Sequence, residues 1–90
     1  MIPSVGRIVH YRLASGDLGQ VQYKQPGMSC NPHREGDIVP MLICRVWAGP
    51  DGANEQTCVN GQAFVDGNFS LWVTSRQQGP NPGQWSDPRG

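Results

Sequence analysis

The chain has 90 residues, and its 7 basic residues balance 7 acidic ones, so the formal net charge is zero. A chain of this length forms one small domain, residues 1–90, with a thin core. The balanced charge excludes the basic surface that usually holds a nucleic-acid backbone. We therefore expect no nonspecific binding to nucleic acid.

The N-terminal segment MIPSVGRIVHY lacks the basic and then apolar pattern of a secretory signal, and no apolar stretch of about 20 residues follows. This pattern predicts a cytoplasmic protein that does not enter a membrane. Cys30, Cys44 and Cys58 include no CxxC pair, and a reducing cytoplasm disfavours disulfides. Cys30 and His33 have a C-x-x-H spacing, but a structural zinc site needs four ligands. We predict neither a metal nor a cofactor.

The first strand is predicted over residues 6–13. With a period of two, Val9, Tyr11 and Leu13 share one face, and Ile8, His10 and Arg12 share the other.

Residues 14–37 follow without a sustained period, which predicts a long loop; any helix would be short and would lie within this segment, and the pattern does not favour one. Loops of this length are usually mobile or functional. It is either a mobile surface loop or a lid that brings Tyr23, Lys24, His33 and Arg34 to a ligand or a neighbouring subunit.

The second strand is predicted over residues 38–47, with Pro40 near its start, at an edge or at a bulge. Leu42, Cys44 and Val46 fall on one face, and Met41, Ile43, Arg45 and Trp47 fall on the other.

A third strand over 57–65 and a fourth over 69–76 flank the sequence DGN at 66–68, a strong hairpin signal because these residues tolerate positive φ. The tail, residues 77–90, is rich in Gly and Pro and is predicted to be irregular, with Trp85 docked on the domain. The sequence thus predicts a mainly β fold: an antiparallel meander of four main strands with one long loop, either open or curled into a small half-open barrel.

Sorting the later strands by face separates a small apolar set from a second, unusual set. The expected core is Leu42, Cys44, Val46, Val59, Gly61, Ala63, Val65, Leu71 and Val73. The second face holds Arg45, Trp47, Asn60, Gln62, Phe64, Trp72 and Thr74. It contains no Lys, Asp or Glu, although a solvated sheet face usually carries charges of both signs.

Three occupants suit this second face. The loop and tail of the chain can cover it, it can form a homo-oligomer interface, or it can bind a ligand, including a ligand held between subunits. Aromatic rings, side-chain amides and one guanidinium suit a planar, hydrogen-bonding ligand such as a nucleotide. Interface cores are also enriched in Trp, Phe and Arg.

Catalytic signals are weak. The two histidines are scattered, no acidic residue lies in a predicted strand, and no serine or cysteine has a neighbouring base. We expect a protein that is not an enzyme.

Three segments, MIPSVGRIVHYRL, GDIVPMLICRVW and VNGQAFVDGNFSLWVTS with the following GPNPGQW, resemble a family of short phage- and prophage-encoded proteins. The similarity covers about half of the chain in matching order. It departs at Cys44, where a second small aliphatic residue is usual, and in the tail QWSDPRG. The positions that match the family's repeated residues are His10, Tyr11, Arg45, Trp47, Asn60, Gln62, Phe64, Asp66, Gly67, Trp72, Thr74, Ser75, Trp85 and Arg89.

The resemblance implies a phage protein acting in the host cytoplasm, and it implies no established activity. Together with the second face, it leads us to expect a non-enzymatic homo-oligomer that sequesters a nucleotide-derived host immune signal, of the cyclic oligonucleotide or cyclic ADP-ribose type. Arg45 would meet phosphate, the aromatic residues would stack, Asn60 and Gln62 would bind ring edges, and His10 joins the expected site. The alternative is a protein-interaction module that inhibits a host protein or serves as a minor virion component. Single-stranded nucleic-acid binding is disfavoured by the neutral charge.

Overall fold

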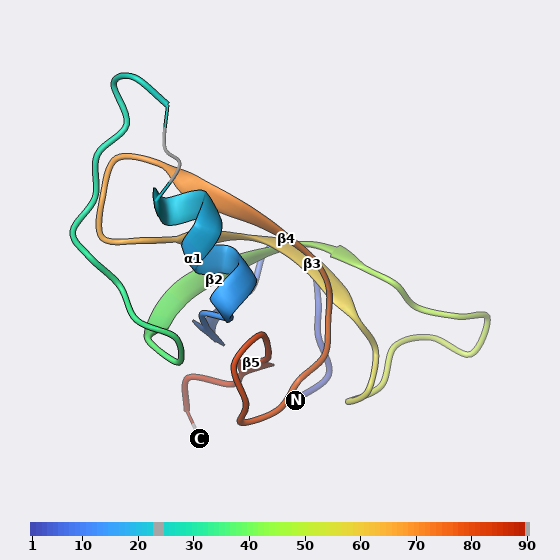
Figure 1. The fold of residues 1–90 in the computed structure, drawn as a ribbon. Coiled ribbons are helices and arrows are strands. Elements are labelled where there is room, and N and C mark those ends of the chain that lie inside the picture. Colours follow the sequence, from blue (N-terminus) through green and yellow to red (C-terminus); the bar gives the residue numbers. More distant parts are fainter. Residues whose placement is uncertain (23–24, 90) are drawn as a thin grey trace.

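The computed structural model describes residues 1–22 and 25–89 and shows one antiparallel sheet with one short helix (Figure 1). The elements, in chain order, are β1 (Ile8–Arg12), α1 (Ser15–Gln22), β2 (Ile38–Val46), β3 (Val59–Phe64), β4 (Ser70–Arg76) and β5 (Trp85–Ser86). The strand order is β4-β3-β2-β1-β5. The predicted mainly β meander is confirmed, and the tail adds a fifth strand beside β1, which the sequence did not predict.

The sheet is not closed into a barrel. At one end, an isolated parallel bridge joins Gln78 to Trp85, so the chain that leaves β4 reaches β5 there. Along the rest of its length β4 forms one edge of the sheet and pairs only with β3 among the described strands.

The core lies on one face of the sheet, which we call the inner face. Its strand residues are Val9, Tyr11, Val39, Met41, Ile43, Val59, Ala63, Leu71 and Val73, and Leu13, Val21, Val65 and Trp85 complete it. Trp85 comes from the tail and is fully buried, as predicted, and its indole Nε1 donates a hydrogen bond to the Arg76 carbonyl at 3.1 Å. The tail therefore covers the inner face and leaves the opposite, outer face open.

The prediction for β2 is wrong over residues 41–44. Met41 and Ile43 are buried in the core, while Leu42 is half-buried and Cys44 is exposed on the outer side. The cause is a bulge between Ile43 and Arg45 that inserts one residue and shifts the alternation. After the bulge, the inward residue is Val46 and the outward one is Arg45, as expected from the sequence.

A short helix, which the sequence allowed within residues 14–37 but did not favour, forms there as α1. The Asp17 carboxylate accepts a hydrogen bond from the backbone N–H of Ala14 at 2.8 Å, so it caps the first turn from inside the helix. Val21 is buried and Leu18 packs against the core. The helix is stabilised by this cap and by its contact with the sheet, since SGDLGQVQ has little intrinsic helical preference.

The rest of the long loop is fastened to the hairpin turn at 66–68. His33 Nε2 accepts the backbone N–H of Asp66 at 3.0 Å, and Asn68 and Ser29 exchange two hydrogen bonds. Gly67 must lack a side chain because a Cβ there would overlap that of Cys30. His33 therefore holds the turn, and Arg34 is exposed; the predicted lid residues Tyr23 and Lys24 lie outside the described residues.

Candidate binding face

The outer face is an uncovered apolar surface on an otherwise ordinary small domain. Strand pairing sets Ile8, Leu42, Gln62 and Trp72 in one row across four strands. Trp72 is 64% exposed and Ile8 61%, and Ile38 and Phe64 are also exposed. Isolated exposed apolar residues are normal, but a contiguous group of large ones usually marks an interaction site.

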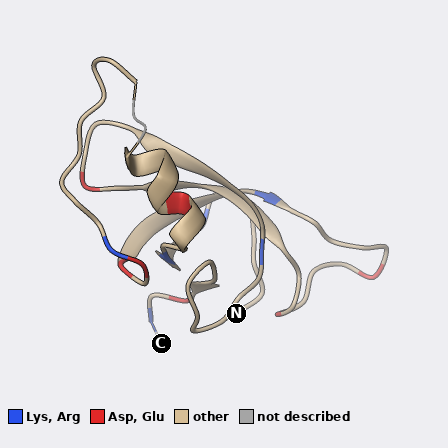
Figure 2. Ribbon diagram, viewed as in Figure 1, with Lys and Arg blue, Asp and Glu red and all other residues tan. Residues whose placement is uncertain are grey.

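The five strands contain no acidic residue. Figure 2 shows the acidic residues on α1, in the loops and in the C-terminal segment, away from the strand ribbons. The charged residues within the strands are Arg12, Arg45 and Arg76, all basic. The outer face therefore has no carboxylate of its own to repel an anion, and its few charges are arginines.

At the end of β2, three predicted site residues form one cluster. The Arg45 guanidinium lies over the Trp47 ring, 4.1 Å from its centroid, a cation–π contact. The Trp47 indole Nε1 donates to the Asn60 side-chain oxygen at 3.0 Å, and this oxygen also accepts the backbone N–H of Ser75 at 2.8 Å.

These bonds give Asn60 a role within the fold. Ser75 has a φ of 55°, in the left-handed region, and sits where the register between β3 and β4 shifts. The side-chain oxygen of Asn60 satisfies the N–H that this bulge removes from the ladder. That oxygen is engaged within the chain, so the predicted contact with a ligand edge is left to the amide N–H groups.

A second cluster surrounds Trp72, which lies opposite Gln62 on β3. The Ser70 hydroxyl donates to the Gln62 side-chain oxygen at 2.9 Å, and Phe64 pairs with Ser70 across the strands. Thr74 is exposed on the same strand. The structure thus brings Gln62, Phe64 and Trp72 together, near the edge of the sheet.

His10 lies apart from both clusters. It pairs with Pro40 on β2 and Ser86 on β5, so β2 separates it from β3 and β4. It lines a cavity of about 390 Å³ with Arg12 and Asp87. Residue spacing along the sequence cannot place His10, because its distance from Trp72 depends on the strand order.

Most residues of the two clusters lie on an open surface, and of their predicted site residues Phe64 alone lines a cavity, of about 330 Å³, beside the hairpin turn of the described chain. None of the main cavities of the described chain is lined by Arg45, Trp47, Asn60, Gln62, Trp72 or Thr74. Small-molecule sites are usually concave and surround most of their ligand. A single copy of the chain therefore offers a flat contact surface here.

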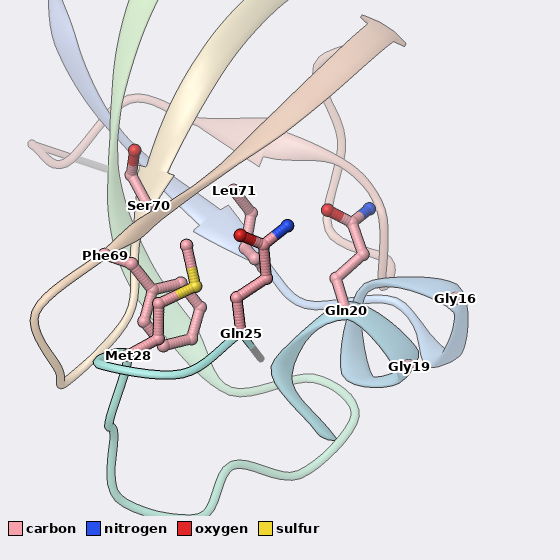
Figure 3. Close-up of a pocket in the computed structure, with 8 residues that line it drawn as sticks. All are labelled: Gly16, Gly19, Gln20, Gln25, Met28, Phe69, Ser70 and Leu71. Atoms are coloured by element: carbon pink, nitrogen blue, oxygen red, sulfur yellow. The ribbon is translucent and has the colours of Figure 1, made fainter. Parts of the chain in front are cut away.

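The largest cavity, about 490 Å³, lies between α1 and the start of β4 and was not predicted (Figure 3). Gly16 and Gly19 line it from the helix, and Met28 lies beside Phe69 at its other side. A Cβ at either glycine would meet nothing within 4 Å. Each glycine costs an α-helix about 1 kcal/mol relative to alanine, and packing within the described chain explains neither.

Under the helix lies a buried polar network that the sequence did not reveal. The Tyr11 hydroxyl donates to the Asp17 carboxylate at 2.6 Å, and Arg76 pairs with the same carboxylate at 3.5 Å. Burial, and then the hydrogen bond with Asp17, raise the pKa of Tyr11 above its ordinary value of 10.0. Tyr11 and Asp17 are inaccessible, with 0% and 2% exposure, so the network joins the helix to the sheet and touches no ligand.

Residues 1–22 and 25–89 contain no cluster of three or more metal-ligating side chains. Cys30, Cys44 and Cys58 are free thiols. No helix in the described ranges is long and apolar enough to cross a bilayer.

Comparison with protein-family models, with curated proteins and with solved structures finds no match to this chain. The similarity to short phage proteins therefore stays a prediction from the sequence.

Proposed function

We propose that this chain is a non-enzymatic binding protein that acts through the outer face of its sheet. The observation that supports this proposal is the contrast between the two faces. The inner face has a complete core, covered by α1 and by Trp85, while the outer face exposes Ile8, Ile38, Phe64 and Trp72. Exposing these side chains to water is unfavourable by roughly 25 cal/mol for each Å² that a partner would cover.

The flat shape of this face favours a polypeptide partner. An interface core is rich in aromatic side chains and arginine and poor in Lys, Asp and Glu, as this face is. If the chain is a phage protein, as its resemblance implies, a host protein is the expected partner.

The test is affinity purification from cells that express the tagged chain. We expect one stoichiometric protein partner with the wild type, and at least a tenfold lower recovery with Ile38→Ser/Phe64→Ser. Both residues are exposed, so the variant should fold. Pro50→Ser, in the exposed loop after β2, is the matched control and should recover the partner fully.

Equal recovery with all three proteins would place the binding surface elsewhere. Failure of the wild type to recover any stoichiometric partner would exclude a polypeptide ligand and leave the second candidate.

The second candidate is sequestration of a nucleotide-derived signal, and the Arg45–Trp47 stack on an acid-free face favours it. A guanidinium held over an indole offers donors to phosphate beside a ring on which a base can stack. Because one copy is flat at this point, a nucleotide site would need a second copy to enclose it. Isothermal titration with cyclic di- and trinucleotides and cyclic ADP-ribose isomers should give heat that Arg45→Ala reduces at least tenfold, and no heat with any of them would exclude this candidate.

A further inference from the structure

β4 is an edge strand without the usual protection. Natural edge strands avoid pairing with other chains by being short or by carrying Pro, Lys or a bulge. The opposite edge, β5, has two residues and is soon followed by Pro88. β4 has seven residues, and from Ser70 to Ser75 it contains no proline, no glycine and no charge; its bulge lies at Ser75, at the far end.

The backbone of residues 70–74 is paired on one side only. Among the described residues its ladder partners come from β3. The engaged groups lie at the end of the strand, where the Ser75 N–H donates to Asn60 and the Arg76 carbonyl accepts from Trp85. In an antiparallel strand, alternate residues direct their N–H and C=O groups away from the neighbour, so this edge offers a row of backbone donors and acceptors.

The largest cavity lies along this same edge. It is lined by both Ser70 and Leu71, whose side chains point to opposite faces of the sheet, so it reaches around the edge of β4. On its other side are Gly16 and Gly19 of α1, as Figure 3 shows. A strand added to β4 would therefore find room beneath it.

We propose that β4 pairs antiparallel with β4 of a second copy of this chain, so that the two sheets become one continuous sheet. The segment is self-complementary: in a register centred on Trp72, Leu71 lies opposite Val73 on the inner side and the two Trp72 rings meet on the outer side. Because residues 70–75 are uncharged and the chain has no net charge, no like charges oppose each other.

The helix fits the same arrangement. Arg76, at the end of β4, pairs with Asp17, near the start of α1, while Gln20 and Ser70 line the same cavity. The helix therefore runs antiparallel to β4, beside it. Gly16 and Gly19 line the cavity beside this edge, and the absence of side chains there leaves room for the added strand.

This pairing ends at two copies and does not continue into a longer assembly. Among the strands that the structure describes, each copy has one long edge, β4, and pairing two copies uses both, while the short β5 edge does not extend the sheet. Because the pairing is confined to one edge strand of each copy, we expect a reversible dimer whose population depends on concentration. The pairing of the two β4 strands does not depend on the proposed function. That the two outer faces then act as one binding surface does rest on the proposed function.

Sedimentation velocity over a range of concentrations tests the dimer. Trp72→Lys places a charge at the paired edge and should raise the Kd at least tenfold. Ile8→Lys is the matched control, because Ile8 has nearly the same exposure and lies in the same row at the other end, and it should leave the Kd unchanged. Hydrogen exchange should show amides in 70–74 slowing as concentration rises.

A wild type that stays monomeric at millimolar concentration would overturn the proposal. Equal dissociation by both lysine variants, without slower exchange at 70–74, would also overturn it, because it would show that the outer faces pack against each other. A monomeric protein whose 70–74 amides slow only when a foreign polypeptide is added would assign the edge to that partner instead. Loss of partner recovery in Ile38→Ser/Phe64→Ser with an unchanged dimer separates this inference from the proposed function.

Discussion

Trp85 and Trp72 show how differently the two faces of this sheet are used. Trp85 is 0% exposed, pairs with β1 and donates its indole N–H to the Arg76 carbonyl. Trp72 is 64% exposed and lies at the edge of the open face. Both are large apolar residues in edge strands of the sheet, yet one completes the core and the other faces solvent. The difference shows that the chain has large apolar side chains left over after its core is filled, and these can contact a partner.

The inner face also holds the structural polar groups. Tyr11, Asp17 and Arg76 are linked to one another beneath α1. On the outer side, Asn60 is also buried and holds the bulge at Ser75, whereas Gln62 is half-buried and bonds to Ser70. Changes on the inner face should therefore alter stability, whereas changes on the outer face should alter binding.

The largest contrast is expected between the two tryptophans. Trp85→Ala should lower the free energy of unfolding by about 3–5 kcal/mol, because it leaves a cavity in a thin core. Trp72→Ala should change it by less than about 0.5 kcal/mol, since little of its contact area is buried. Urea unfolding followed by circular dichroism measures both, and similar losses would mean that the outer face is not a free surface.

Alkaline pH should lower the free energy of unfolding through Tyr11, which lies on the inner face. Because the folded state raises the pKa of Tyr11, an unfolded Tyr11 loses its proton near its ordinary value of 10.0 while the folded one keeps it. Unfolding then releases a proton, so the stability from this group is complete below pH 10 and falls above it, by up to about 1.4 kcal/mol per pH unit. Tyr11→Phe should remove this part of the decline in unfolding curves measured between pH 9 and 11; an unchanged slope would contradict it.

The smallest effect is expected at the helix. Gly16→Ala and Gly19→Ala should each raise the stability of the monomer by about 0.5–1 kcal/mol, because the added methyl group meets nothing within 4 Å. Thermal unfolding at low protein concentration checks this. Gly67→Ala is the contrasting control and should be destabilising, since its Cβ would overlap that of Cys30. A loss of stability at Gly16 and Gly19 would show that the glycines serve the chain's own packing.

The sequence predicted the strands better than it predicted the bulge in β2 and the helix α1. The period of two in residues 59–65 correctly identified Val59, Ala63 and Val65 as core, and in residues 9–13 it correctly placed Val9, Tyr11 and Leu13 on one face without saying that this face is the core. The same rule failed over residues 41–44, because one inserted residue at Cys44 reverses the alternation and no local pattern marks a bulge. The sequence allowed a short helix in residues 14–37 but did not favour it, because the Asp17 carboxylate that caps the first turn is held by Tyr11 and Arg76, and Arg76 is distant in the sequence.

The candidate site was predicted in part. The acid-free face was found from composition and period, and the structure brings Gln62, Phe64 and Trp72 together on it. The separate position of His10 was not predictable, since it follows from which strands are neighbours.

By itself, the sequence determined the fold class of this protein, a small antiparallel meander with one face free of acidic residues, because strand periodicity and hairpin signals act over a few residues. Only the tertiary structure decided which face is covered. Trp85 returns from the end of the chain to the inner side, and α1 is fixed there by contacts with β1 and β4. These are long-range contacts between segments that local patterns treat as independent, and they leave the outer face and the edge of β4 open for partners.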